Sequence, residues 1–278
     1  MRTLSCQFIL LAVLISICVI NGAVNDKCHE KCDCEDLNVV CKLGKVPSES
    51  FGDFFDPSVT KMHIDNSDAE TSLNDKTKLE PLTSQILTYE DLTNLTLKDC
   101  YIETIDDDAF KDIVALKYLN LDENKITTLT SRSFFGLRHL QSLSMKSNKL
   151  STIPGGAFEP LISVVTLILS NNLIDTIQSG AFPKQALIEY LDIGGNPNIR
   201  TIPPAVDALI TLDKLIARDC KINELRDNWL QKFPGLIEVD LTNNLIVELK
   251  QSHFGGLTEL RKVSYFKSGA YVFWMRPP

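Results

Sequence analysis

The cysteines are the residues whose type and spacing first suggest chemistry. Of the eight in the chain, four lie close together at Cys28, Cys32, Cys34 and Cys41. Thiols this close in sequence either form disulfides or, with a residue such as His29, bind zinc. The secretion signal described below favours disulfides, because an oxidising compartment stabilises them. The spacing alone leaves three connectivities open.

Groups that could perform catalysis are sparse. The four histidines are scattered, at His29, His63, His139 and His253. No nucleophile elbow, phosphate-binding loop or metal-binding helix motif occurs in the sequence. The run of three aspartates at 106–108 could bind calcium, although consecutive carboxylates on a loop are more often a solvated surface. We therefore expect a protein that is not an enzyme and that holds no cofactor or metal.

One modification motif is present, the N-glycosylation sequon Asn94-Leu95-Thr96. A glycan at Asn94 would make the protein a glycoprotein and would cover whichever surface the asparagine faces. The sequence leaves open whether the sequon is used.

The N-terminus indicates secretion. Arg2 precedes a mostly apolar run of 13 residues, Phe8–Ile20, and small residues follow at 22 and 23. A helix that spans a bilayer needs about 20 residues, so we interpret 1–23 as a signal peptide rather than as an uncleaved anchor. No later segment is long and apolar enough to span a membrane. We expect a secreted, extracellular protein without a transmembrane segment.

The charge balance excludes several classes of partner. The net charge is −8, from 28 Lys and Arg against 36 Asp and Glu, without a cluster of basic residues. Nucleic acids and anionic membrane surfaces both require such a cluster. We therefore expect no nucleic-acid partner.

A repeat of 24 residues is the element that must position all of these groups. From Leu92 the pattern LxxLxLxx(N/C)xLxxL occurs seven times, and a broken eighth unit begins at Leu260. The N/C column contains Cys100, Asn124, Asn148, Asn172, Asn196, Cys220 and Asn244. A second column keeps the same spacing, with Phe110, Phe134, Phe158, Phe182, Val206, Leu230 and Phe254. Two columns that stay in phase over seven units predict seven similar structural turns.

This pattern resembles the typical extracellular leucine-rich-repeat family over about 92–266. The resemblance implies an α/β-type repeat solenoid: a curved horseshoe with a parallel β-sheet on its concave face and short irregular or 3₁₀ segments on its convex face. It also implies an N-terminal cap in which Cys28 pairs with Cys34 and Cys32 with Cys41. The expected organisation is a signal peptide (1–23), a disulfide-bonded cap (24–58), a degenerate first repeat with a polar loop (59–91), seven repeats (92–259), and a partial repeat with an apolar tail (260–278).

The repeat has two departures and an unusual end. Cys100 and Cys220 stand in the asparagine column five turns apart, too far to bridge, so we expect buried free thiols. In the fifth unit Ile199 comes one place late, which predicts a bulge and a flat concave face at Gly194 and Gly195. The tail lacks the family's C-terminal cysteine cluster. It could form its own cap or the edge of a dimer, but we favour a truncated or spliced chain.

Alternation within each strand predicts which residues face outward on the concave side. Asn94 and Thr96 belong to that face, so a glycan there is sterically allowed and would shield its N-terminal part. The expected ligand contacts are Tyr118, Asn120, Asp122, Ser144, Lys146, Ile168, Tyr190, Asp192, Ile216, Arg218 and Asp240.

Tyrosine and arginine are enriched at protein interfaces, and Tyr118, Ile168, Tyr190 and Ile216 could form one apolar stripe. We expect a non-catalytic module that binds an extracellular protein, as a free factor, a matrix-associated protein or a receptor-ectodomain fragment. The alternative is an accessory or inhibitory subunit of a secreted enzyme.

Overall fold

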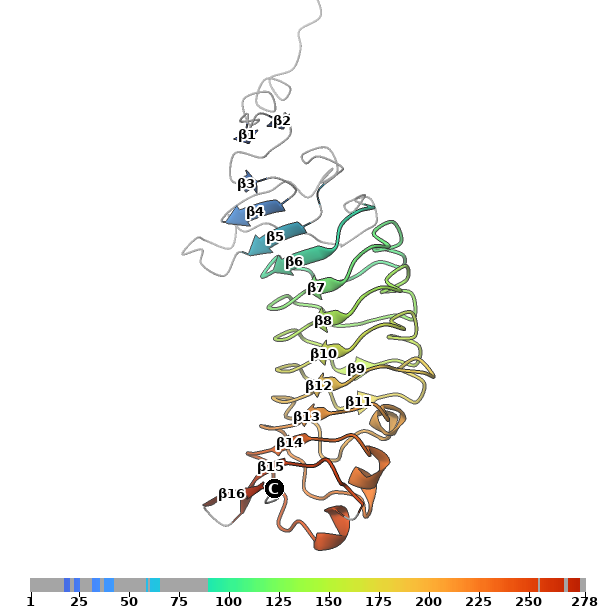
Figure 1. Ribbon diagram of the computed structural model, residues 1–278, viewed down its shortest axis with the longest axis vertical. Helices are drawn as coiled ribbons and strands as arrows, with labels where there is room; N and C mark the ends of the chain where they lie inside the picture. The colour runs from blue at the N-terminus through green and yellow to red at the C-terminus, as the bar shows by residue number, and fades with distance from the viewer. Residues whose placement is uncertain are drawn as a thin grey trace, which may run out of the picture.

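The protein is described here from a computed structural model. The structure describes residues 18–20, 23–25, 32–35, 38–42, 59, 61–65, 90–254, 256–267 and 270–275. Cys28, most of the expected signal peptide and most of the polar loop lie outside the described residues. From residue 90 onward the chain winds through stacked turns, and each turn contributes one short strand to a single long sheet (Figure 1).

The long sheet has twelve strands in the order β16-β15-β14-β13-β12-β10-β8-β7-β6-β5-β4-β3. Its strands are β3 (Cys32–Glu35), β4 (Asn38–Lys42), β5 (Lys61–Asp65), β6 (Asn94–Lys98), β7 (Tyr118–Asn120), β8 (Ser142–Ser144), β10 (Thr166–Ile168), β12 (Tyr190–Asp192), β13 (Lys214–Ile216), β14 (Glu238–Leu241), β15 (Lys262–Lys267) and β16 (Ala270–Met275). From β4 to β15 neighbouring strands are parallel, and from β6 their register advances by 24 residues per turn. The predicted parallel-sheet solenoid is confirmed.

Short strands and helices complete the turns away from this sheet. A two-residue parallel pair, β9 (Thr152–Ile153) and β11 (Thr176–Ile177), lies between the third and fourth turns. Three 3₁₀ helices follow in the C-terminal turns: η1 (Pro204–Ala208), η2 (Trp229–Lys232) and η3 (Gln251–Phe254). Near the N-terminus, β1 (Cys18–Ile20) and β2 (Ala23–Asn25) form an antiparallel pair. Within the described part of the chain, no helix has the length and apolar character needed to cross a bilayer.

The core is a continuous column of aliphatic and aromatic side chains between the sheet and the convex side. In β6 the side chains alternate, so that Leu95 and Leu97 are buried while their neighbours are partly exposed. On the convex side Phe110, Phe134, Phe158 and Phe182 stack in succession, with ring centroids 6.1, 5.9 and 5.7 Å apart. Each of these rings is nearly or completely buried. The spacing of 24 therefore stacks like residues on one another, as a solenoid requires.

Asparagine side chains connect successive turns where each strand ends. Asn148 Nδ2 donates hydrogen bonds to the carbonyls of Leu121 (2.9 Å) and Met145 (3.1 Å). Its Oδ1 accepts the N–H of Ile126 in the preceding turn, at 3.0 Å. Asn124, Asn172, Asn196 and Asn244 make corresponding bonds. The column thus satisfies buried backbone groups that would otherwise lack partners.

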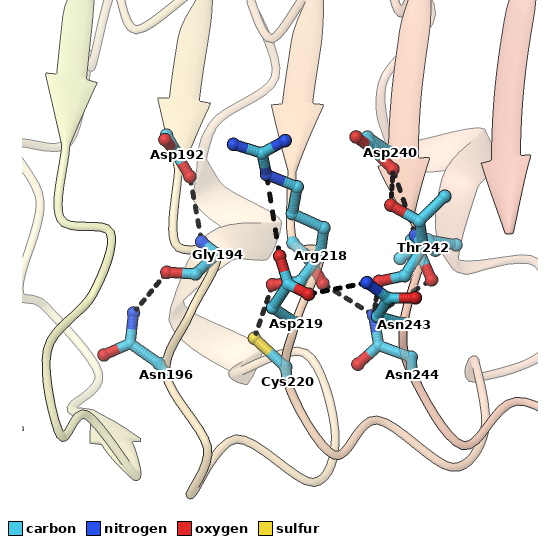
Figure 2. Close-up of polar contacts among 12 residues, drawn as sticks. Asp192, Gly194, Asn196, Arg218, Asp219, Cys220, Asp240, Thr242, Asn243 and Asn244 are labelled. Carbon is cyan, nitrogen blue, oxygen red and sulfur yellow. Dashed lines mark hydrogen bonds and ion pairs between the residues drawn. The ribbon is translucent and has the colours of Figure 1, made fainter. Parts of the chain in front are cut away.

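Cys220 occupies the same column, but its thiol takes over only the donor role of the asparagines (Figure 2). Its Sγ donates to the carbonyls of Ile193 and Arg218, each at 3.5 Å. The N–H of Ile199 does not need a side-chain acceptor from the next turn, because it bonds to the carbonyl of Asn196 within its own turn, at 3.1 Å. The extra residue before Ile199 makes that local bond possible. Burial raises the pKa of the Cys220 thiol to about 11, so the group stays a neutral donor. As expected, Cys220 and Cys100 are buried thiols that form no disulfide.

The convex side changes after Phe182. The next two residues of the phenylalanine column are Val206 and Leu230, which are not aromatic. The large aromatic side chain in this region is Trp229, which packs edge-on against Phe233 with ring centroids 5.1 Å apart. The indole Nε1–H of Trp229 donates to Asp207 at 2.7 Å.

Asp207 also accepts from the two terminal guanidinium nitrogens of Arg226 (2.9 and 2.6 Å) and from Lys232 Nζ (2.8 Å). Burial alone would raise the pKa of Asp207, but these three donors outweigh it and lower the pKa to about 2. The clamp around Asp207 joins η1 to η2.

Both ends of the sheet carry antiparallel strands. At the N-terminal end β3 pairs with β4, and the register places Cys32 directly opposite Cys41. Met62 and Ile64, in the expected degenerate first repeat, lie in β5 and are buried. At the C-terminal end β16 pairs with β15, so the apolar tail extends the sheet by one strand.

Candidate binding face

The outward positions of the sheet fall into three columns because the register is constant. The first column contains Asn94, Tyr118, Ser142, Thr166, Tyr190, Lys214, Glu238 and Lys262. The second contains Thr96, Asn120, Ser144, Ile168, Asp192, Ile216, Asp240 and Ser264. The third follows two residues later, with Lys98, Asp122, Lys146, Ser170, Gly194, Arg218 and Thr242. All of the expected contacts thus share one face, as alternation predicts.

The aspartates of this face are already bonded to their surroundings. Asp192 Oδ1 accepts the N–H of Gly194 at 2.9 Å, and Asp240 Oδ1 accepts both the N–H (3.0 Å) and the hydroxyl (2.7 Å) of Thr242 (Figure 2). These bonds close a turn at the end of each strand.

Asp122 is engaged in a related way. Its Oδ1 accepts the N–H of Lys146 (2.8 Å) and the hydroxyl of Ser144 (2.5 Å) from the next turn. Through these bonds the Oδ1 atoms of Asp122, Asp192 and Asp240 hold the shape of the face.

A charged network occupies the C-terminal half of the first column. Glu238 bonds to Lys214 on one side (3.0 Å) and to Lys262 on the other (2.8 Å). Partial burial would raise the pKa of Glu238, but the two lysines outweigh it and lower that pKa. Lys214 Nζ also lies 5.7 Å from the centre of the Tyr190 ring. The four side chains from Tyr190 to Lys262 form one connected row.

The four residues of the expected apolar stripe do not form one line. Tyr118 and Tyr190 share the first column, but Ser142 and Thr166 lie between them. In the second column, Asp192 separates Ile168 from Ile216. The register instead places Ile168 and Ile216 in the second column, in the turns on either side of Tyr190, which lies in the first column, and Tyr118 stands apart.

The comparisons with known proteins agree with this geometry. The family model described as "Leucine rich repeat" matches residues 90–150 and 138–197. The fold is a leucine-rich-repeat solenoid. Proteins of this class are generally protein-binding modules and are typically non-catalytic. Among curated proteins, none matches the sequence significantly.

Two solved structures share the leucine-rich-repeat fold. Internalin C2 from Listeria monocytogenes is 23% identical, with a TM-score of 0.55, over 75% of this chain and 81% of that one. A chain of the Toll–Spatzle complex of Drosophila is 21% identical, with a TM-score of 0.67, over 80% of this chain. The match spans only 28% of the length of that second chain.

Arg218 is the most open cation of the C-terminal half of the leucine-rich-repeat face. Its side chain is 59% exposed, and its Nε lies 3.8 Å from Asp219 Oδ2 (Figure 2). The neighbouring position in the preceding turn is Gly194, where a Cβ atom would come within 3.1 Å of the Arg218 carbonyl. The missing side chain leaves the face flat beside the guanidinium. A partner carboxylate could approach Arg218 from that side.

Sequence reasoning missed Lys214, Glu238 and Lys262 as members of the face. Their signal was available, since each follows Tyr190 by a multiple of 24 residues in the first column. The network was not visible from composition, because it depends on side chains reaching across turns.

The remaining groups that suggested chemistry have structural partners in the solenoid. Asp107 accepts the hydroxyl of Thr130 (2.5 Å), and Asp108 pairs with Arg132 (2.6 Å), so both carboxylates bond to the next turn. His253 is buried in η3, and its Nδ1 accepts the N–H of Lys250 at 3.2 Å. In the part of the chain that the structure describes, no group of three or more potential ligands could hold a metal ion.

Proposed function

We propose that the chain is a secreted, non-catalytic module that binds an extracellular protein through the outward columns of its sheet. The observation that carries the proposal is the C-terminal half of the face, where half-buried Tyr190 and buried Ile216 lie among Lys214, Arg218 and Lys262. Aromatic and aliphatic side chains surrounded by charged groups are typical of interface hot spots. A chain of similar fold belongs to the Toll–Spatzle complex, which supports a protein as the partner class here.

Secretion is the second part of the proposal. The apolar N-terminal run and the four clustered cysteines support it. The register that sets Cys32 opposite Cys41 is compatible with a disulfide between them, since facing residues of antiparallel strands have Cα atoms about 5 Å apart. The family resemblance implies a second bridge, between Cys28 and Cys34. Intact-mass and peptide mapping of the secreted protein test the cleavage site and both bridges.

Self-association through the C-terminal end is a third element. Among the described strands, β16 has a neighbour on one side only, and its sequence, Ala-Tyr-Val-Phe-Trp-Met, contains no charge or proline. Such an edge is open to pairing with a second copy. Light scattering of the purified chain over a concentration series tests this, and a monomer at every concentration would contradict it.

Affinity capture tests the binding face. Wild-type protein and the double variant Tyr118→Ala/Tyr190→Ala are used as bait in extracellular fluid, with Val247→Ala as a matched control. Val247 is 79% exposed and lies outside the three columns. We expect the double variant to lose about tenfold or more in capture of a specific partner, and the control to lose nothing. Undiminished capture by the double variant would refute the proposed face.

A further inference from the structure

The two outward tyrosines of the first column have different surroundings. Tyr190 is half-buried beneath Lys214, within the charged row that runs to Lys262. The pKa of its hydroxyl is raised, chiefly by burial and then by Asp192. Tyr118 is 47% exposed, and its ring has no aromatic or cationic contact with any residue that the structure describes. Tyr118 therefore presents a bare aromatic surface, and Tyr190 belongs to a built network.

Asn94 is the neighbour of Tyr118 in the adjacent strand. The register pairs Asn94 of β6 with Tyr118 of β7, and their side chains lie on the same face about 4.8 Å apart by strand spacing. The side-chain oxygen of Asn94 accepts the hydroxyl of Thr93 at 2.9 Å. Its nitrogen, the atom that glycosylation modifies, has no hydrogen bond to a described residue. Thr96 completes the sequon on the same face, partly exposed.

We propose that Asn94 carries an N-linked glycan whose first N-acetylglucosamine lies on the ring of Tyr118. This rests on the proposed secretory route, which supplies the donor, a polyprenyl-diphosphate-linked oligosaccharide. The transfer forms a bond between Asn94 Nδ2 and C1 of the sugar and breaks the bond between C1 and the phosphate oxygen. The amide proton is lost and the polyprenyl diphosphate leaves. The apolar face of the sugar then covers aromatic surface that is otherwise exposed to water.

The glycan divides the face into two parts. Tyr118 and Tyr190 are three strands apart, about 14 Å by strand spacing, so the first sugar covers Tyr118 and leaves Tyr190 open. The partner of the proposed function therefore binds the half from Ile168 to Lys262, where Arg218 and the charged row lie. Tyr118, expected from sequence to contact the ligand, serves the glycan instead.

The first experiment concerns the glycan alone and needs no partner. The full chain is secreted from eukaryotic cells as wild type, Tyr118→Ala, Tyr190→Ala and Thr96→Val, the last of which removes the sequon and keeps the shape of the side chain. Each is treated with an endoglycosidase that leaves one N-acetylglucosamine, and is compared with the same protein made without glycosylation, in which residue 94 remains asparagine. Mass spectrometry reads the occupancy of residue 94, and thermal unfolding is measured for each form.

We expect the single sugar to raise the melting temperature by about 2 °C in wild type and in Tyr190→Ala. The increase should vanish in Tyr118→Ala, and the sugar should be absent from Thr96→Val. An unmodified Asn94, or an increase that persists in Tyr118→Ala, would overturn the proposal.

The second experiment separates this inference from the proposed binding function. Single variants Tyr118→Ala and Tyr190→Ala are compared in affinity capture, each fully glycosylated. We expect Tyr190→Ala to lose about tenfold in capture and Tyr118→Ala to lose less than twofold. Loss in Tyr118→Ala alone would overturn the division of the face. If the increase in melting temperature depends on Tyr118 but neither variant loses capture, the proposed binding face is refuted and the glycan site is supported.

Discussion

The turns around Asn148 and those around Cys220 both provide hydrogen-bond partners for buried backbone groups, but they use different side chains. At Asn148 one amide donates to two carbonyls and accepts the N–H of Ile126 from the preceding turn. At Cys220 the thiol only donates, and the N–H of Ile199 finds its acceptor within its own turn. The late position of Ile199 and the loss of the asparagine are therefore linked. A repeat can therefore lose a standard residue when a second irregularity nearby supplies one of the hydrogen bonds that the residue would have made.

The convex sides of the same two regions differ in a parallel way. Between Phe110 and Phe182 stacked rings fill the space between turns. Beyond them Val206 is smaller, and the clamp of Asp207 on Arg226, Trp229 and Lys232 joins the turns instead. The first region is held by apolar packing and the second by a charged group with three donors. The two regions should therefore respond differently to truncation and to pH.

The largest expected effect is on the aromatic stack. Phe158→Ala removes a ring that stacks on both Phe134 and Phe182, and we expect it to lower the free energy of unfolding by about 4 kcal/mol. Val206→Ala, at the equivalent position of the other region, should cost about 2 kcal/mol or less because fewer methyl groups are lost. Urea unfolding followed by circular dichroism measures both. A loss for Phe158→Ala no larger than that for Val206→Ala would contradict the predicted role of the stack.

The next largest effect is on the asparagine column. Asn148→Ala leaves the Ile126 N–H and two carbonyls without their side-chain partner, all of them buried, and we expect a loss of about 3 kcal/mol. Asn148→Asp keeps the acceptor and removes the donors, so it separates the two roles. The same unfolding measurement applies. A loss below that of an exposed substitution such as Lys149→Ala would contradict the assigned role of the column.

The clamp of Asp207 predicts a pH dependence that the stacked region lacks. Its pKa in the folded protein is lowered to about 2, so its contribution is complete above the unfolded pKa of about 4. That contribution is lost as the pH falls from about 4 towards 2. We expect Asp207→Asn to destabilise the protein by about 1 kcal/mol at pH 7 and by much less near pH 2. Asp175→Asn, at an exposed aspartate, is the control, and a pH-independent difference for Asp207→Asn would refute the charged role.

Sequence predicted the parts of this molecule that the 24-residue spacing imposes on every turn. The buried leucines, the phenylalanine column, the asparagine bonds and the outward face all follow, since like residues must meet across turns. The clamp of Asp207 did not follow, because Arg226 and Lys232 lie 19 and 25 residues away, off the repeat spacing. The expected apolar stripe was wrong for a different reason. Its members lie on the predicted face, but Tyr118 and Tyr190 differ by 72 residues and Ile168 and Ile216 by 48, so the same spacing already placed the two pairs in separate columns.

The smallest expected effect is the sharpest test of the comparison between Asn148 and Cys220. Cys220→Ala removes one weak S–H donor, shared between two carbonyls, and a small buried group, and we expect a loss of about 1 kcal/mol, a third of that at Asn148. Cys220→Asn restores the repeat residue, and its amide could donate to the Ile193 carbonyl as its neighbours in the column do.

The restored oxygen would have little to accept, because the N–H of Ile199 is already bonded to Asn196. We therefore expect Cys220→Asn to change the free energy of unfolding by less than about 0.5 kcal/mol. A stabilisation above about 1 kcal/mol would mean that the local bond of Ile199 is weak and that the bulge and the cysteine arose independently. Deleting Asn198 in the Cys220→Asn background then decides the matter. If the two irregularities are linked, the deletion is better tolerated with asparagine at position 220 than with cysteine, since the Ile199 N–H again needs an acceptor from the next turn.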